Sequence, residues 1–328
     1  MELPTAPFRA DLAEGPVGAH AYWVHADDGV RLRVARYPSA GPSEGTPSKG
    51  TVLLFPGRTE YVEKYGRTAA DLSAAGYDTL TIDWRGQGLS DRLLANGLVG
   101  HVQLFTDYQR DVAALLTAAR ELALPQPMHL ISHSMGGAIG LRAVMDGLPV
   151  ASCVFTGPMW GIRIAPAIRP AAWALGWGSG HIGLGHLYSP GTKPASYVIS
   201  EPFKDNMLTR DADMYAYMRR QVAEVPALAL GGPSLRWLHQ SLLECRTLER
   251  RASPDLPCLT FVGLKERIVD VPRIRNRMAR WPHGRLELVA GAEHEVLMDS
   301  AETRKAVMSQ IVALFDSASA KPHSAQSA

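Results

Sequence analysis

The residues best suited to chemistry lie in the segment Ser132-His133-Ser134-Met135-Gly136. An apolar run at residues 128–131 has strand character, and residues 136–145 have the apolar spacing of a helix. Ser134 therefore lies at a tight turn from strand to helix, where a serine hydroxyl projects from the backbone and can act as a nucleophile. The pattern S-x-S-x-G differs from G-x-S-x-G at Ser132, a small residue that we interpret as tolerable there.

A serine hydroxyl is a weak nucleophile at neutral pH, so it needs a base within hydrogen-bond reach. Histidine is the side chain whose unperturbed pKa suits this role, and the chain contains eleven. His294 is favoured because it follows the last predicted strand, at the sheet edge where α/β folds bind ligands. His283 precedes that strand and belongs to the opposite edge. His133 is expected to project from the other side of the nucleophile turn.

The carboxylate that orients the base is expected in the loop after the preceding strand. This loop offers Glu266, just past the strand, and Asp270, at the start of the following helix. An acidic residue at a helix N-terminus stabilises the helix and has a structural reason to be there. Since both Asp and Glu serve as the acid of such triads, we favour Glu266 over Asp270.

Attack on an ester carbonyl creates an oxyanion that backbone N–H groups must stabilise. One donor is expected to be Met135, the residue after the nucleophile. The second is expected in the loop after the first parallel strand, at Arg58 in Pro56-Gly57-Arg58. The guanidinium of Arg58 could face the substrate or, equally well, the solvent.

A scaffold must bring these distant segments together. Strands are predicted at residues 21–25, 30–37, 51–55, 78–82, 128–131, 150–155, 258–262 and 285–289. Helical spacing is found at 61–76, 106–122, 136–145, 237–250, 271–280 and 301–315. This alternation predicts an α/β fold with a mostly parallel central sheet and helices on both faces.

The alternation stops at residues 156–234, which are rich in Gly, Pro, Trp, Tyr and Met. So long a departure inside a compact domain is usually functional, and we predict an inserted helical cap, or lid, there. The core is then formed by 20–155 and 235–315. An irregular N-terminal segment at 1–19 and a disordered Ser/Ala-rich tail at 316–328 complete the predicted organisation.

The composition, with 46% hydrophobic and 20% charged residues, is typical of a soluble globular protein. A net charge of +2 without basic runs predicts no nucleic-acid partner. Three widely spaced cysteines, Cys153, Cys245 and Cys258, argue against a disulfide framework or a zinc site. The sequence shows no secretory signal and no apolar stretch of membrane-spanning length, so we expect a cytoplasmic protein.

Five segments together resemble the serine hydrolases of the α/β-hydrolase fold. They are Phe55-Pro56-Gly57-Arg58, Asp83-x-Arg85-Gly86-x-Gly88-x-Ser90, His133-Ser134-Met135-Gly136-Gly137, Gly263-x-x-Glu266-x-x-Val269 and Gly291-x-x-His294-Glu295. Within this group the chain is most similar to bacterial lysophospholipases and monoacylglycerol lipases. It departs from the usual pattern in Ser132 for Gly, in Pro-Gly for the frequent His-Gly, and in Glu266 for the commoner Asp.

The resemblance implies a cap that covers the site and holds an acyl chain. Four aromatic residues of the cap would bind the substrate, although they could equally form the cap's own core: Trp160, Trp173, Trp177 and Tyr188. The predicted function is hydrolysis of single-chain lipid esters, lysophospholipids or monoacylglycerols, through an acyl-enzyme and without cofactor or metal.

Two other functions remain open on the sequence alone. A peptidase or iminopeptidase could use the same fold, and a non-catalytic protein could bind a ligand in the same pocket. The sequence is also compatible with a protein that contacts a membrane surface transiently, and it does not predict an oligomeric state.

Overall fold

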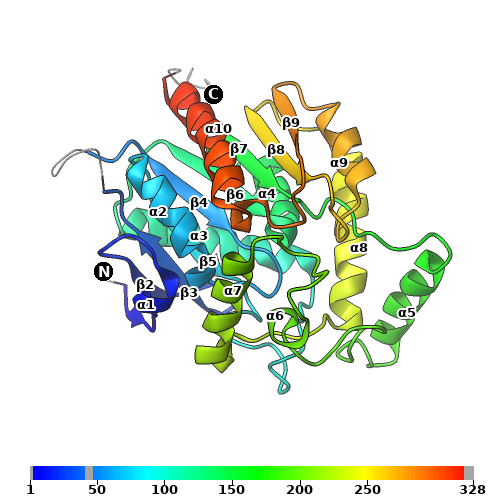
Figure 1. The fold of residues 1–328 in the computed structure, drawn as a ribbon. Coiled ribbons are helices and arrows are strands. Elements are labelled where there is room, and N and C mark those ends of the chain that lie inside the picture. Colours follow the sequence, from blue (N-terminus) through cyan, green and yellow to red (C-terminus); the bar gives the residue numbers. More distant parts are fainter. Residues whose placement is uncertain (1–2, 41–46, 321–328) are drawn as a thin grey trace.

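The structure, a computed structural model, describes residues 3–40 and 47–320. Within these residues the centre is a nine-stranded sheet with the order β1-β2-β3-β5-β4-β6-β7-β8-β9 (Figure 1). The pairs from β1 to β5 are antiparallel, and those from β5 to β9 are parallel. The predicted α/β class with a mostly parallel sheet is confirmed.

The strands are β1 (Thr5–Ala6), β2 (His20–His25), β3 (Arg31–Tyr37), β4 (Thr51–Phe55), β5 (Asp78–Asp83), β6 (Met128–His133), β7 (Cys153–Thr156), β8 (Cys258–Gly263) and β9 (Gly284–Val289). The helices are α1 (Ala10–Ala13), α2 (Gly66–Ala74), α3 (Tyr108–Glu121), α4 (Ser134–Met145), α5 (Arg169–His181), α6 (Tyr197–Ser200), α7 (Ala212–Glu224), α8 (Leu235–Arg250), α9 (Val271–Met278) and α10 (Ala301–Ser319). Short 3-10 turns are η1 (Val62–Tyr65), η2 (Phe105–Asp107), η3 (Pro226–Leu228) and η4 (Val296–Met298).

Helices cover both faces of the sheet, because successive side chains of a strand point to opposite sides. Leu53 and Phe55 of β4 pack in one apolar cluster with α3 and α4. Val52 and Leu54 pack in a second cluster with α2 and α10, which lie in front of the sheet in Figure 1. All residues of β4, β5, β6 and β8 are buried, as expected for strands covered on both faces, and β4 has the near-continuous apolar sequence typical of such a strand.

The described residues near each end of the chain contain more secondary structure than predicted. In the segment 1–19, Thr5 and Ala6 pair with β2 as an edge strand, and α1 follows. At the other end, α10 runs to Ser319, so the predicted tail boundary after Phe315 was wrong. The added residues have partners, since Asp316 accepts a hydrogen bond from Tyr77 and the Ser319 hydroxyl contacts His129. Residues 321–328 lie outside the described part of the chain.

Between β7 and α8 the described chain adds α5, α6 and α7 and no strand to the sheet. Figure 1 shows these three helices on one side of the sheet, at the bottom of the view. α7 packs with η1 and α1, and α5 packs against α8. The arrangement is compatible with a cap, and the limits 156–234 for that unit stay a prediction. No helix in 3–40 or 47–320 has the length and apolarity needed to cross a bilayer.

Candidate active site

Ser134 lies at the turn where β6 ends and α4 begins. Its backbone φ is +50°, in the left-handed region that non-glycine residues seldom adopt. Such strain persists where the surrounding structure enforces it, and it is frequent at functional positions. The half-buried Ser134 side chain lines the cavity described below.

Small residues make this turn possible. A Cβ atom on Gly136 would lie 2.3 Å from the carbonyl oxygen of Phe55, so only glycine allows α4 to start this close to β4. Ser132 is accommodated by a second glycine, since a Cβ atom on Gly140 would lie 2.3 Å from the Ser132 hydroxyl oxygen. The larger residue at the first position of G-x-S-x-G is thus accommodated by a glycine about two turns into α4.

Glu266 and His294 are brought together from the ends of β8 and β9. The distance from His294 Nδ1 to Glu266 Oε2 is 2.6 Å, and both side chains are buried. The other carboxylate oxygen, Oε1, accepts hydrogen bonds from the backbone N–H groups of Ile268 at 2.6 Å and Val269 at 3.1 Å. The carboxylate is therefore held by three donors and fixes the imidazole, leaving Nε2 free of Glu266.

The same contacts keep Glu266 ionised. Burial raises the pKa of its carboxyl, but the charge and hydrogen bond of His294 and the two backbone N–H groups outweigh burial and lower it. A carboxyl with a lowered pKa stabilises the fold above its ordinary pKa and loses that contribution as the pH falls through the lowered value.

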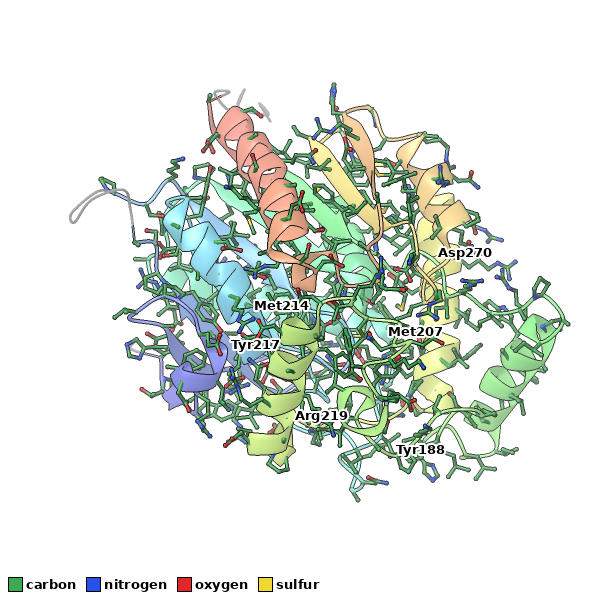
Figure 2. The ribbon with its side chains drawn as sticks, viewed as in Figure 1. Tyr188, Met207, Met214, Tyr217, Arg219 and Asp270 are labelled. Carbon is green, nitrogen blue, oxygen red and sulfur yellow. The ribbon has the colours of Figure 1, made fainter. Side chains whose placement is uncertain are left out.

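Asp270, the alternative acid, has a different role in the structure. It is the N-cap residue of α9, and its Oδ1 accepts a hydrogen bond from the backbone N–H of Arg273. Its other oxygen lies 3.5 Å from Arg169 and 3.7 Å from Arg273. In Figure 2 it is seen at the start of α9. These contacts favour Glu266 as the partner of the histidine.

Arg58 and Met135, the predicted oxyanion donors, line the same cavity as Ser134 and His294. Met135 is in the first turn of α4, where backbone N–H groups have no partner within the helix. Within the described residues the backbone N–H of Arg58 has no backbone acceptor. Both groups are therefore available to a ligand.

The cavity at this edge has a volume of about 310 Å³. Its apolar wall comes from the core and from the segment before α8: Met159, Ile162, Val198, Met207, Leu208, Met218, Val222, Trp237, Leu238, Ile268 and Val269. His294 and Glu295 are also tied to this segment, since their N–H groups donate to the carbonyls of Met207 and Leu208. The arrangement can hold an apolar ligand against a serine, a histidine and two free N–H groups.

The family model for serine aminopeptidases, S33, matches residues 46–301. The chain belongs to this family. Its relatives by sequence include lysophospholipase L2 of Escherichia coli, 33% identical over 275 residues, which are 81% of this chain and 80% of the relative. The probable lysophospholipase L2 of Haemophilus influenzae is 28% identical over 79% of this chain and 82% of its own.

Solved structures agree on the fold of this S33-family chain. A soluble variant of the monoglyceride lipase of Saccharomyces cerevisiae, in complex with a substrate analog, has a TM-score of 0.69 at 19% identity and covers 90% of this chain and 94% of its own. A thermostable carboxyl esterase from Bacillus coagulans has a TM-score of 0.71 at 15% identity, with 92% and 99% covered. The resemblance to α/β-hydrolases is confirmed.

The four aromatic residues predicted to bind the substrate are not among the residues that line this cavity. Trp160 is buried in the core, where its Nε1 donates to the Gly137 carbonyl at 3.0 Å. Trp173 packs edge-on against a histidine of α8, Trp177 is 60% exposed, and Tyr188 pairs with the residue before α8.

Other residues of the same segment line the cavity where the aromatic residues were expected. In Figure 2, Tyr188 lies at the lower end of the segment, apart from Met207, which lines the cavity. Met207 and Leu208 follow α6, and Met218 and Val222 are on α7. The sequence signal for them was the helical spacing of Met214, Met218 and Val222, which identifies an apolar face without showing what it covers.

Sequence reasoning missed a buried cluster of charges beside His294. Lys64 Nζ lies 2.6 Å from Glu60 Oε1 and 2.6 Å from Glu295 Oε1. Glu60 also accepts a hydrogen bond from the Tyr65 hydroxyl at 2.5 Å. Because Glu295 follows His294 directly, the cluster anchors the loop that carries the histidine. The spacing of Glu60 and Lys64, four residues apart, was the available signal.

His133 completes the cluster. Its Nδ1 lies 2.9 Å from the Thr156 carbonyl oxygen, which requires a proton on Nδ1, and its Nε2 lies 3.3 Å from Glu295 Oε2. Burial lowers the pKa of His133, but Glu295 and Glu60 outweigh burial and raise it. The raised pKa favours the imidazolium form of His133 beside these two carboxylates.

The cluster also contains donor atoms suited to a metal ion. Ligand atoms of Glu60, His133 and Glu295 lie within 4.8 Å of one another. Both carboxylates, however, already bind the Lys64 ammonium at 2.6 Å. A metal ion would have to displace that ammonium, so the donor set fits a salt-bridge cluster better, and we derive no metal-dependent step.

Replacing Lys64 with Met is expected to lower the free energy of unfolding by about 3 to 5 kcal/mol, because two buried carboxylates lose their shared cation. Urea unfolding of the purified variant measures this loss. The control is Lys49→Met, whose half-exposed pair with Asp316 is worth less than about 1 kcal/mol. Equal losses in the two variants would contradict the role given to the buried cluster.

All three cysteines, Cys153, Cys245 and Cys258, are free and buried. Burial raises the pKa of the Cys245 thiol to about 12, so it is a poor nucleophile at neutral pH. Cys245 therefore does not compete with Ser134 for the role of nucleophile.

Proposed function

We propose that this chain is a carboxylic-ester hydrolase that cleaves single-chain lipid esters, lysophospholipids or monoacylglycerols, through an acyl-enzyme. The observation that carries the proposal is the hydrogen bond of 2.6 Å between buried Glu266 and His294, at the same cavity as the strained Ser134. The relatives named lysophospholipase L2 and monoglyceride lipase support the class of substrate.

In the proposed mechanism the Ser134 hydroxyl attacks the acyl carbonyl and gives its proton to His294 Nε2. Glu266 stabilises the imidazolium, and the oxyanion accepts hydrogen bonds from the N–H groups of Arg58 and Met135. The tetrahedral intermediate collapses, the ester C–O bond breaks, and His294 returns the proton to the leaving alcohol. Water then attacks the acyl-enzyme with His294 as base and releases the fatty acid and Ser134.

The cavity favours a lipid over a peptide. Its wall is mainly apolar, which suits an acyl chain. A peptidase that removes N-terminal residues must bind a charged amino group, for which a carboxylate is the natural partner. The carboxylates of Glu60 and Glu295 line the cavity, but both are bound to Lys64. They are therefore not available to a substrate amine.

A panel of substrates tests this function. We expect lysophospholipid and monoacylglycerol esters to be hydrolysed with kcat/KM at least about 100-fold above that for a proline arylamide, because the arylamide cannot fill an apolar cavity of this kind. Ser134→Ala measured with the same panel identifies any contaminating esterase. Faster release from the arylamide would replace the lipase proposal with an iminopeptidase.

We further propose that α5 and the loop after it contact a membrane surface. The exposed fraction is 60% for Ile168, 60% for Trp177 and 69% for Ile182. Residues 157–200 contain no Asp or Glu, so this surface does not repel anionic lipids. These properties are typical of a segment that lies on a bilayer surface.

Sedimentation with vesicles of anionic phospholipid tests this contact. Trp177→Ser combined with Ile182→Ser is expected to lower the bound fraction at least about tenfold, because two large apolar side chains are lost from the interface. Val17→Ser, which removes another exposed apolar side chain far from α5 in the sequence, is the control. If both proteins bind vesicles as the wild type does, α5 is not the contact.

A further inference from the structure

We propose that the Arg58 guanidinium binds the phosphate of a lysophospholipid head group and thereby makes the enzyme prefer lysophospholipids to monoacylglycerols. This inference rests on the proposed ester hydrolysis and deepens it, because it chooses between the two substrate classes. It assigns to the Arg58 side chain a role separate from that of its backbone N–H.

Arg58 is a cation in the cavity wall without a carboxylate partner within residues 3–40 and 47–320. Its Nη1 donates one hydrogen bond of 2.8 Å to the Gly231 carbonyl oxygen. Its guanidinium carbon lies 5.6 Å from the centre of the Trp237 ring. These contacts orient the group and leave most of its N–H donors for a ligand.

The other basic side chains at the cavity already have carboxylate partners. Lys64 is shared between Glu60 and Glu295 at 2.6 Å each. His294 is bound to Glu266. An anion that enters the cavity therefore finds its uncompensated positive charge at Arg58.

The surroundings of Arg58 favour an anionic ligand. Burial lowers the pKa of the guanidinium to about 10, so it is disfavoured as a buried cation but still charged at neutral pH. An isolated buried charge is costly unless it is paired. A phosphate would supply the missing partner, and the planar guanidinium can donate two parallel hydrogen bonds to phosphate oxygens.

Arg58, in the loop after β4, carries two donor groups that could meet two parts of one substrate. Its backbone N–H is proposed to hold the ester carbonyl oxygen, and its side chain extends from the same residue to Gly231. In a lysophospholipid a glycerol bridge links the ester to the phosphate, so both groups can meet one residue. A monoacylglycerol carries a neutral hydroxyl in place of the phosphate and cannot neutralise the cation.

The test compares two lipids with the same short acyl chain, a lysophosphatidylglycerol and a monoacylglycerol, below their micellar concentrations. In Arg58→Gln we expect the ratio of kcat/KM for the two lipids to fall about 10- to 100-fold, mainly through KM for the lysophospholipid, because one charge-assisted contact is lost. Arg236→Gln is the matched control, since its guanidinium donates to the Gln103 carbonyl outside the cavity. It should change the ratio by less than about twofold.

The outcomes separate this inference from the function on which it rests. If Arg58→Gln lowers both activities equally, phosphate recognition is overturned and ester hydrolysis stands. If the wild type hydrolyses neither lipid, both the proposed function and this inference are overturned.

A second measurement avoids dependence on the folding of Arg58→Gln. Glycerol 3-phosphate is expected to inhibit the wild type at least about tenfold more strongly than glycerol, and Arg58→Lys should weaken that inhibition because lysine cannot form the paired contact. Equal inhibition of the wild type by the two compounds would overturn the proposal.

Discussion

Replacing Ser134 with Ala is expected to lower kcat for lipid-ester hydrolysis by about 10⁴- to 10⁶-fold. Removal of the nucleophile leaves only the oxyanion donors and substrate binding, which give a small residual rate. The measurement is steady-state hydrolysis of a soluble lysophospholipid. Since Ser134 starts α4 at a strained φ of +50°, Ala takes the same position without a new polar group, and the folded structure should persist.

Ser132→Ala is the matched control, because it removes a hydroxyl two residues away on the same turn. The Ser132 hydroxyl is buried and has no hydrogen-bond partner in the described residues, so its loss should cost little. We expect kcat to change by less than about tenfold. If Ser134→Ala kept activity like that of Ser132→Ala, the nucleophile would have to be sought elsewhere.

Glu266→Gln is expected to lower kcat by about 10³- to 10⁴-fold with little change in KM. The amide has the shape of the carboxylate, but its NH₂ group can donate a hydrogen bond to His294 Nδ1 and thus favour the wrong tautomer. It also removes the negative charge that stabilises the imidazolium. Hydrolysis rates measured across a range of substrate concentrations separate kcat from KM.

Asp270→Asn is the control for the acid. Asn is as good an N-cap as Asp, so α9 should keep its start and the fold its stability. The lost charge weakens partly exposed contacts with Arg169 and Arg273, and kcat should fall less than about tenfold. A larger loss in Asp270→Asn than in Glu266→Gln would transfer the role of the acid to Asp270.

The positions of Ser134, Glu266 and His294 could be predicted from the sequence because of one geometric rule. Residues that follow parallel strands meet at the carboxyl edge of the sheet, and each of the three follows a strand that the sequence predicts. The local sequence therefore predicted both the type of each catalytic candidate and its position at this edge of the sheet. The same rule placed Arg58 after β4.

Which residues of the segment 156–234 line the cavity could not be predicted in the same way, because the helices of this segment do not alternate with strands of the sheet. Trp160 was expected over the substrate but lies in the core, where it packs against the nearby Phe155 and against Trp281 from a distant part of the chain. Apolar residues such as Met207 and Met218 line the cavity instead. Aromatic content indicates burial and leaves open what the side chain is buried against.

The charged cluster and the chain ends escaped prediction for a related reason. Lys64 and Glu295 are 231 positions apart, so their pairing depends on the tertiary fold. A strand of two residues, such as Thr5–Ala6, carries no periodic signal, and it exists because β2 offers an open edge. Contacts between distant segments decide these features.

The most direct test of the central claim is labelling of the wild-type protein with a fluorophosphonate, followed by mass spectrometry of its peptides. Only an activated serine reacts readily with this reagent. We predict one adduct, on Ser134, that is lost in His294→Ala although the hydroxyl remains. A native protein that stays unlabelled, or an adduct on another serine, would contradict the proposal that Ser134, His294 and Glu266 act together.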